Sequence, residues 1–265
     1  AGTKETMAGI KRKDIIDYFN KQYVGDNAVV TVAGNTKDGD ALKKVEKYFS
    51  PLRPGKSYDK GEVRDVQNHP AVLLHTKQTD QTHICLGARG FNLFDPRKYV
   101  AQLMATVLGG GMSSRMFISV RERKGLVYYV STMCDSDTDT GSILTRAGID
   151  NTKVEKAIAT IVSEYKKIKR EKVSDSELKK AKNYIRGKTY LGLEASDDVA
   201  EFLGGQEILE NQILSTEEIL KHLESVTPKQ VQGVAREMFV PEHMNLALVG
   251  PFEDKSKFEE LIGEI

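Results

Sequence analysis

The stretch LGGGMSSRMFISVRERKGLVYYV, residues 108–130, combines features that an ordinary buried segment does not need. Three glycines precede two serines, a basic run of helical character follows, and a fourth glycine separates this run from paired tyrosines. The first glycines predict that a helix ends in a tight turn, because glycine tolerates backbone conformations that other residues avoid. Ser113 or Ser114 is then expected to cap a second helix over 115–124, which Gly125 should end before a strand begins.

The sequence on either side of this stretch alternates paired strands with helices. Strands are predicted for the segments 71–76, 82–90, 126–134, 141–149 and 245–250. Asp95 and Pro96 predict the start of a helix, and an apolar stripe from Val154 to Ile168 predicts a long one. The pairs Ser174–Glu177 and Ser215–Glu218 form capping-box patterns that predict the starts of two further helices. Paired strands with helices between them indicate the α+β class, with an antiparallel sheet backed by helices.

Two distant segments of the chain share one pattern. Residues 11–35 and 227–251 align without a gap, with Gly34 matching Gly250, and each predicts an amphipathic helix, a turn and a strand. Such self-similarity indicates tandem duplicated domains. We therefore expect residues 1–54 to be the C-terminal tail of a first domain, 55–70 a linker, and 71–265 a complete second domain.

The tail of the first domain carries apolar residues that lack the rest of their domain. Ile15, Phe19 and Val30 should therefore be exposed in this chain. Exposed apolar patches mark association surfaces, so self-association or a packing partner is expected.

Composition limits the classes of function. The 265 residues include 29% charged residues but carry a net charge of only +1, which argues against a nucleic-acid partner. No apolar run approaches the length of a membrane span. The two cysteines, Cys85 and Cys134, form no disulfide framework and are compatible with a reducing compartment, so a cytoplasmic location is expected.

The sequence predicts no metal site and no catalytic residue for zinc chemistry within this chain. None of its histidines belongs to an H-x-x-E-H or H-E-x-x-H pair, the spacing that places two ligands on one helix face. There is also no G-x-S-x-G nucleophile elbow and no P-loop lysine after the glycines.

The opening stretch closely resembles the second-half signature of the insulinase-like (pitrilysin) zinc peptidases, a family that includes mitochondrial processing peptidase and insulin-degrading enzyme. The residues that carry the resemblance are Leu108-Gly109-Gly110, Ser114-Arg115, Arg121-Glu122, Gly125-Leu126 and Tyr128. The segments 191–194 and 27–35 are also similar to family segments. The resemblance covers essentially the whole chain.

The resemblance implies a division of labour between two halves that close like a clamshell around an unfolded peptide. The zinc-binding H-x-x-E-H helix belongs to the first half, and the corresponding helix here, YVAQLMATVLGG, carries no ligand. The chain therefore resembles the substrate-binding half of a zinc metalloendopeptidase. Its implied partners are a peptide substrate and a zinc-bearing half, either covalently attached or a separate subunit, and the chain alone should be inactive.

The resemblance also implies roles for two residues. Arg121 and Tyr128 match the arginine and tyrosine with which this half reaches the zinc site, and they should hold the substrate backbone. Strict alternation along a strand would place Tyr129 on the opposite face from Tyr128. An alternative is a noncatalytic core subunit of a respiratory complex, as some family members are; the arginine–tyrosine pair favours the peptidase.

Overall fold

The structure is a computed structural model that describes residues 2–56, 60–64 and 66–265. The chain divides into two compact units, which are described separately. Unit 1 contains Ala1–Glu62 and Tyr190–Leu214, and unit 2 contains Val63–Thr189 and Ser215–Ile265. The sequence-based boundaries assigned all of 71–265 to one domain, whereas this division assigns residues 190–214 to unit 1.

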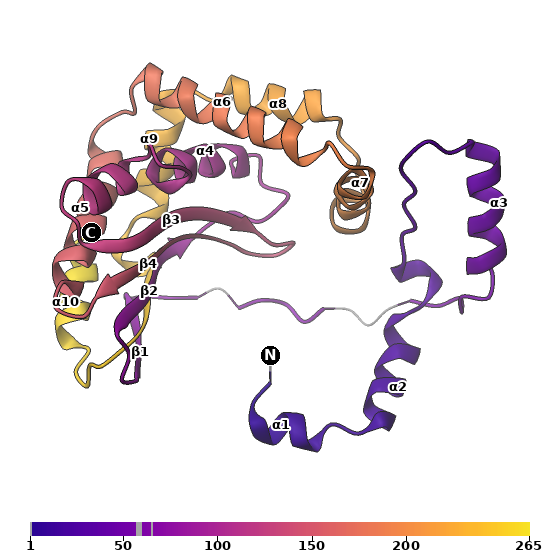
Figure 1. Ribbon diagram of the computed structural model, residues 1–265, viewed down its shortest axis with the longest axis horizontal. Helices are drawn as coiled ribbons and strands as arrows, with labels where there is room; N and C mark the ends of the chain where they lie inside the picture. Colours follow the sequence, from indigo (N-terminus) through magenta and orange to yellow (C-terminus); the bar gives the residue numbers. More distant parts are fainter. Residues whose placement is uncertain (1, 57–59, 65) are drawn as a thin grey trace. The chain divides into compact units, whose positions relative to one another are not determined.

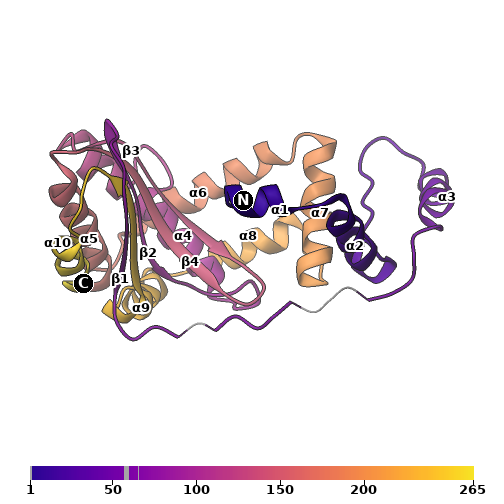
Figure 2. The same cartoon turned by 90° about the horizontal axis from the view of Figure 1, so that it is seen from below.

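Unit 2 is built on a five-stranded sheet (Figures 1 and 2). Its strands are β1 (Ala71–Thr76), β2 (Gln81–Arg89), β3 (Val127–Ser136), β4 (Gly141–Asp150) and β5 (Met244–Gly250). Their order across the sheet is β1-β5-β2-β4-β3, and all neighbours are antiparallel except β1 and β5. The predicted α+β class, a sheet backed by helices, is confirmed, with one parallel pair at its edge. A parallel pair requires a long connection, and almost the whole unit separates β1 from β5.

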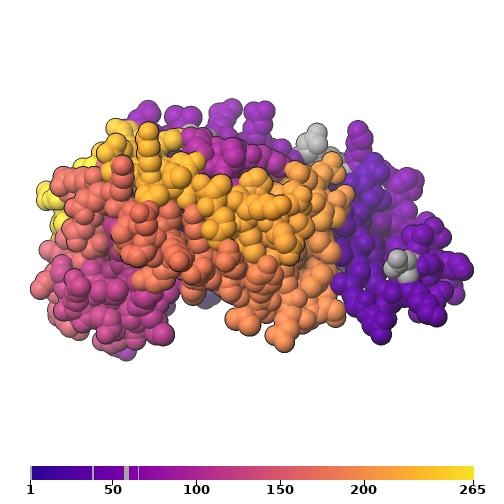
Figure 3. All heavy atoms as spheres, turned by 90° about the horizontal axis from the view of Figure 1, so that it is seen from above, coloured from indigo at the N-terminus to yellow at the C-terminus, as the bar shows by residue number. Residues whose placement is uncertain are grey.

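The helices of unit 2 supply the other layer. They are α4 (Lys98–Gly109), α5 (Val154–Arg170), α6 (Asp175–Gly192), α8 (Thr216–Ser225), α9 (Pro228–Met238) and α10 (Ser256–Gly263), with the end of α6 passing into unit 1. The apolar stripe predicted for α5 is buried, as expected. Helix α4 begins at Lys98 rather than Pro96, because Asp95 forms a separate turn by accepting a hydrogen bond from the Arg97 backbone N–H. Seen from the helical side, atoms of α6 and α8 form much of the surface (Figure 3).

One face of the sheet is buried against these helices and the other is open. Alternate residues of β2 (Ile84, Leu86 and Ala88) lie in the core with residues of α4, α5, α9 and α10. Tyr165 of α5 is fully buried, and its hydroxyl lies 3.1 Å from the Leu86 carbonyl oxygen. Burial raises the pKa of Tyr165, which therefore stays neutral and serves as a satisfied core residue.

Unit 1 is mostly helical and carries little core of its own. Its helices are α1 (Lys4–Gly9), α2 (Arg12–Gln22), the 3₁₀ turn η1 (Gly25–Asn27), α3 (Asp38–Phe49) and α7 (Ser196–Glu210). The side chains of Ile15, Phe19 and Val30 are all exposed, which confirms the prediction for this segment.

The helix and the turn of the two repeat segments have the same local conformation, but the part that follows the turn differs. Helix α2 and η1 match α9 and the 3₁₀ turn η3 (Pro241–His243) residue for residue in the alignment. The residue that ends each helix adopts nearly the same φ and ψ: −90° and 76° at Tyr23, −87° and 68° at Phe239. The strand predicted after the turn of the first segment is wrong, because residues 28–34 form no strand, whereas their counterparts form β5. The second segment forms a strand because β1 and β2 pair with it on either side, and the first segment has no such pairing among the described residues.

Candidate functional site

Arg121 and Tyr128 lie at one corner of unit 2, where a short helix leads into the sheet. The structure has a π-helix, Phe117–Glu122, in the middle of the segment predicted to be an α-helix. The backbone N–H of Leu126 donates to the carbonyl of Val120 at 3.0 Å, which closes the corner. Gly125 has the positive φ, 56°, that the predicted helix stop requires. Single-turn π-helices occur frequently at functional sites, so this corner is a natural candidate.

Both candidate side chains have polar ends without a partner. The Arg121 side chain is exposed, and its guanidinium carbon lies 4.9 Å from the centre of the Phe117 ring. The Tyr128 side chain is 54% exposed. Within the part of the chain that the structure describes, neither makes a hydrogen bond or an ion pair. A guanidinium and a phenol hydroxyl are thus available on adjoining elements.

A β-bulge at the start of β3 determines the direction of Tyr128. Val127 pairs with Ile149 and Tyr129 pairs with Gly148, so Tyr128 is the extra residue with no partner opposite. Both tyrosines are exposed, although Val127 before them is buried. The prediction that they point to opposite faces is therefore wrong, because a bulge interrupts the alternation.

Tyr129 differs from Tyr128 in being held against the sheet. Its hydroxyl lies 3.1 Å from Nδ1 of His83 on β2. Between them lies Gly148, and a Cβ there would approach the Tyr129 ring to 2.4 Å. The glycine thus makes room for the ring to cross β4, and of the two tyrosine hydroxyls only that of Tyr128 has no partner among the described residues. Nothing in the sequence indicated that His83 takes part in this corner.

The glycines of the opening stretch serve packing rather than a tight turn. None of Gly109, Gly110 and Gly111 has a positive φ, and Gly110, which follows the last residue of α4, has right-handed φ and ψ values of −75° and −13°. A Cβ on Gly109 would lie only 2.3 Å from the backbone nitrogen of Thr132. Helix α4 therefore approaches β3 closely enough to exclude any side chain. The prediction of a tight turn that needs the backbone freedom of glycine is therefore wrong. Glycine is required at position 109 because α4 lies so close to β3.

The predicted serine cap is also wrong. Ser114 is buried, and its Oγ has no hydrogen-bond partner among the described residues. Helix 117–122 has no side-chain cap. The neighbouring Arg115 instead forms a two-bond ion pair with Glu177, at 2.9 Å and 3.1 Å, which ties this segment to the start of α6.

Glu177 has two tasks in this connection. It accepts a hydrogen bond from the backbone N–H of Ser174 as part of the predicted capping box. The hydrogen bonds that Glu177 accepts from Arg115 and from Ser174 lower its pKa from the usual 4.5 to about 2.

Replacing Glu177 by glutamine should lower the free energy of unfolding by about 1–3 kcal/mol at neutral pH, since it removes charge-assisted hydrogen bonds. A lowered folded-state pKa contributes stability above pH 4.5 that is lost as the pH falls towards 2. Urea denaturation of both proteins at several pH values tests this. Glu171→Gln, at an exposed residue, is the control and should change stability by less than about 0.5 kcal/mol. If the free energies of unfolding of wild type and variant still differ by the same amount at pH 2, the stabilising role of the Glu177 carboxylate is contradicted.

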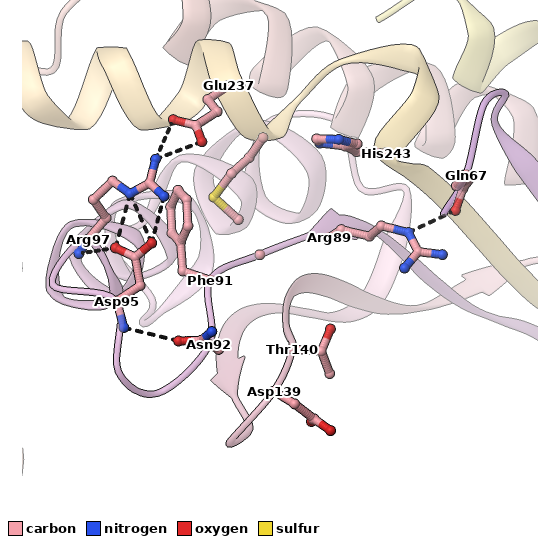
Figure 4. A pocket seen from close by; sticks show the side chains of 12 residues that line it. Gln67, Arg89, Phe91, Asn92, Asp95, Arg97, Asp139, Thr140, Glu237 and His243 are labelled. Carbon is pink, nitrogen blue, oxygen red and sulfur yellow. Dashed lines mark hydrogen bonds and ion pairs between the residues drawn. The ribbon is translucent and has the colours of Figure 1, made fainter. Parts of the chain in front are cut away.

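A pocket of about 320 Å³ lies at the end of the sheet opposite the Arg121–Tyr128 corner, where β2 ends and β4 and β5 begin (Figure 4). At its wall, Arg97 donates to both carboxylate oxygens of Glu237, at 2.7 and 2.9 Å, and to Asp95. The two carboxylates raise the pKa of Arg97, and Arg97 lowers that of Asp95. Because Arg97 is neutralised in this way, we assign it a structural role in joining the loop before α4 to α9.

The described residues do not offer a site for zinc. They contain no group of three or more histidine, cysteine, aspartate or glutamate side chains that could hold a metal ion. Cys85 and Cys134 are free thiols, and burial raises the pKa of Cys134 to about 12, which makes it a poor nucleophile. No described helix is both long and apolar enough to span a membrane.

The fold of the chain matches that of solved peptidase domains. A protease structure from Helicobacter pylori has a TM-score of 0.86 at 20% identity, with 94% of this chain and 62% of that chain covered. The peptidase M16 inactive domain from Pseudomonas fluorescens also has a TM-score of 0.86, at 19% identity, with coverages of 95% and 60%. The chain therefore has the fold of these solved peptidase structures.

The sequence comparisons identify the family. A Bacillus subtilis protein named as uncharacterized zinc protease YmxG is 33% identical over 254 residues, which cover 94% of this chain and 60% of that protein. The chain therefore spans about three fifths of this relative. The model of the peptidase M16 inactive domain matches residues 9–185. The chain belongs to this family, which confirms the resemblance found in the opening stretch.

Proposed function

We propose that this chain is the substrate-binding half of a zinc metalloendopeptidase that encloses unfolded peptides between two halves. The observation that carries the proposal is the corner formed by Arg121 and Tyr128. Their exposed polar ends have no partner among the described residues, and the two residues lie on the π-helix and on the edge strand β3 that follows it. A structural subunit has no need to keep two such groups without partners at one corner.

The two side chains suit two different tasks. The Arg121 guanidinium presents a planar fork of donors that fits peptide carbonyl groups, and the Phe117 ring beneath it limits its motion. Tyr128 supplies one hydroxyl donor on a strand, a rigid element. A fixed donor contributes most where negative charge develops on the carbonyl oxygen in the transition state, so we assign this task to Tyr128.

The zinc ion of the proposed enzyme belongs to the other half. The relatives are named zinc proteases, while the residues described here do not fit a zinc ligand set. We propose that the zinc-bearing half also packs on unit 1, whose apolar residues Ile15 and Phe19 are exposed. Covalent attachment of that half and its association as a separate subunit would assemble the same site.

This chain alone should bind no stoichiometric zinc and cleave no peptide, and cleavage should begin when a zinc-bearing half is added. Elemental analysis after dialysis and cleavage of an unfolded fluorogenic peptide measure the two expectations. One tightly held zinc ion per chain would overturn the division of labour. Formation of a stable complex that cleaves no unfolded peptide would instead favour the noncatalytic core subunit.

A further inference from the structure

The open face of the sheet has a regular arrangement of side chains that the proposed function does not yet use. Three rows of cross-strand neighbours run across all five strands on this face. The row that contains Tyr129 is His75, Val249, His83, Gly148 and Tyr129. The central row is Leu73, Ala247, Cys85, Arg146 and Ser131. The third row is Ala71, Asn245, Gly87, Leu144 and Met133.

Arg146 is the one permanently charged residue in these three rows, which contain no aspartate or glutamate. Its side chain is exposed, and it forms no hydrogen bond or ion pair with a residue that the structure describes. On the same face, Asp150 and Asp135 lie two rows away on either side. Rows lie about 7 Å apart, so the Cα atoms of these two residues lie about 13 Å or more from that of Arg146, and neither carboxylate forms an ion pair with it. Arg146 therefore places a positive charge in the central row of this face, on β4.

The surroundings of Arg146 suit a peptide better than a small ion. In its own row, Ala247 is exposed and Leu73 is 71% exposed, which provides an apolar surface beside the charge. On the other side, Arg146 lies one row from Tyr129 and therefore close to the corner of Arg121 and Tyr128. An extended peptide advances about 3.3 Å per residue, so a peptide held at Tyr128 can place a side chain on Arg146 within about three residues.

We propose that Arg146 determines substrate specificity by binding an aspartate or glutamate side chain of the peptide. This inference rests on the proposed function. An arginine fork and a carboxylate form two parallel charge-assisted hydrogen bonds, and the absence of a competing carboxylate in the three rows leaves Arg146 available for this contact. The occupant is thus an acidic segment of an unfolded peptide, within about three residues of the position held by Tyr128.

The test measures binding of labelled peptides to the full 265-residue chain by fluorescence anisotropy. A set of otherwise identical peptides carries one glutamate, or one glutamine, at each position in turn. At one position or at two neighbouring positions, glutamate should improve affinity over glutamine about tenfold, the usual order for a charge-assisted contact. Arg146→Gln should abolish this preference, and Arg146→Glu should reverse it in favour of lysine at that position.

Two controls separate this contact from general charge effects. Arg170→Gln removes an exposed positive charge at the end of α5 and should leave the glutamate preference unchanged. Arg121→Gln should weaken the binding of all peptides alike, because in the proposed function the Arg121 side chain contacts the peptide backbone.

The possible failures are distinguishable. If all peptides bind but glutamate gives no preference at any position, the inference about Arg146 is overturned while the proposed function stands. If no peptide binds the wild-type chain, both are overturned. If the wild-type chain is a dimer that Arg146→Glu dissociates, the face binds a second copy of the chain, and the inference is again overturned.

Discussion

Replacing Tyr128 by phenylalanine should lower the turnover of the assembled peptidase by about one to three powers of ten, the usual range for the loss of one oxyanion donor. The change removes only a hydroxyl group that is exposed and has no partner among the described residues, so folding should be nearly unaffected. The loss should therefore fall on kcat, with little change in the unfolding transition. Peptide cleavage kinetics and thermal unfolding of the reconstituted enzyme give the two measurements.

Tyr129→Phe is the matched control, because the two tyrosines are adjacent and similarly exposed. The Tyr129 hydroxyl is already engaged with Nδ1 of His83, so its removal should change turnover much less. The contrast between the tyrosines thus depends on hydrogen bonding and not on opposite faces of a strand. Equal and small effects of both changes would show that the pair is structural, and the noncatalytic core subunit would then be the better interpretation.

Replacing Gly109 by alanine should lower the free energy of unfolding by about 1–3 kcal/mol or more, as overpacking of a close contact does. The added Cβ would lie 2.3 Å from the backbone nitrogen of Thr132, and backbone cannot move aside as a flexible side chain can. Helix α4 and strand β3 would have to separate. Because β3 also carries Tyr128, this separation should lower peptidase activity as well. Denaturant unfolding measures the stability effect.

Gly111→Ala provides the comparison within the same motif. The nearest atom to a Cβ there is a carbon of the Tyr184 ring at 3.5 Å, an ordinary contact, so stability should change by less than about 0.5 kcal/mol. If the two alanine variants unfold alike, the close approach of α4 to β3 does not explain the first glycine of the motif.

The sequence alone predicted those features that short segments specify. The stripe of α5, the capping boxes at Ser174 and Ser215, and the helix stop at Gly125 all depend on residues within a few positions of each other. The same holds for the repeat: α2 and α9 end in the same conformation although one leads into a strand and the other does not. The exposure of Ile15 was also predicted, from the interpretation of its segment as the tail of a duplicated domain.

Tertiary structure decided whatever depends on residues that are distant in sequence. The bulge that directs Tyr128 arises where β3 pairs with β4, so no pattern within β3 could reveal it. The need for Gly109 comes from Thr132. His83 meets Tyr129, and Arg146 lies between Cys85 and Ser131 in its row, only because the strands pair in one register. Local sequence determines helices, caps and turns through short-range hydrogen bonds and backbone preferences, whereas the candidate site depends on strand register and close packing, which exist only once the sheet has formed.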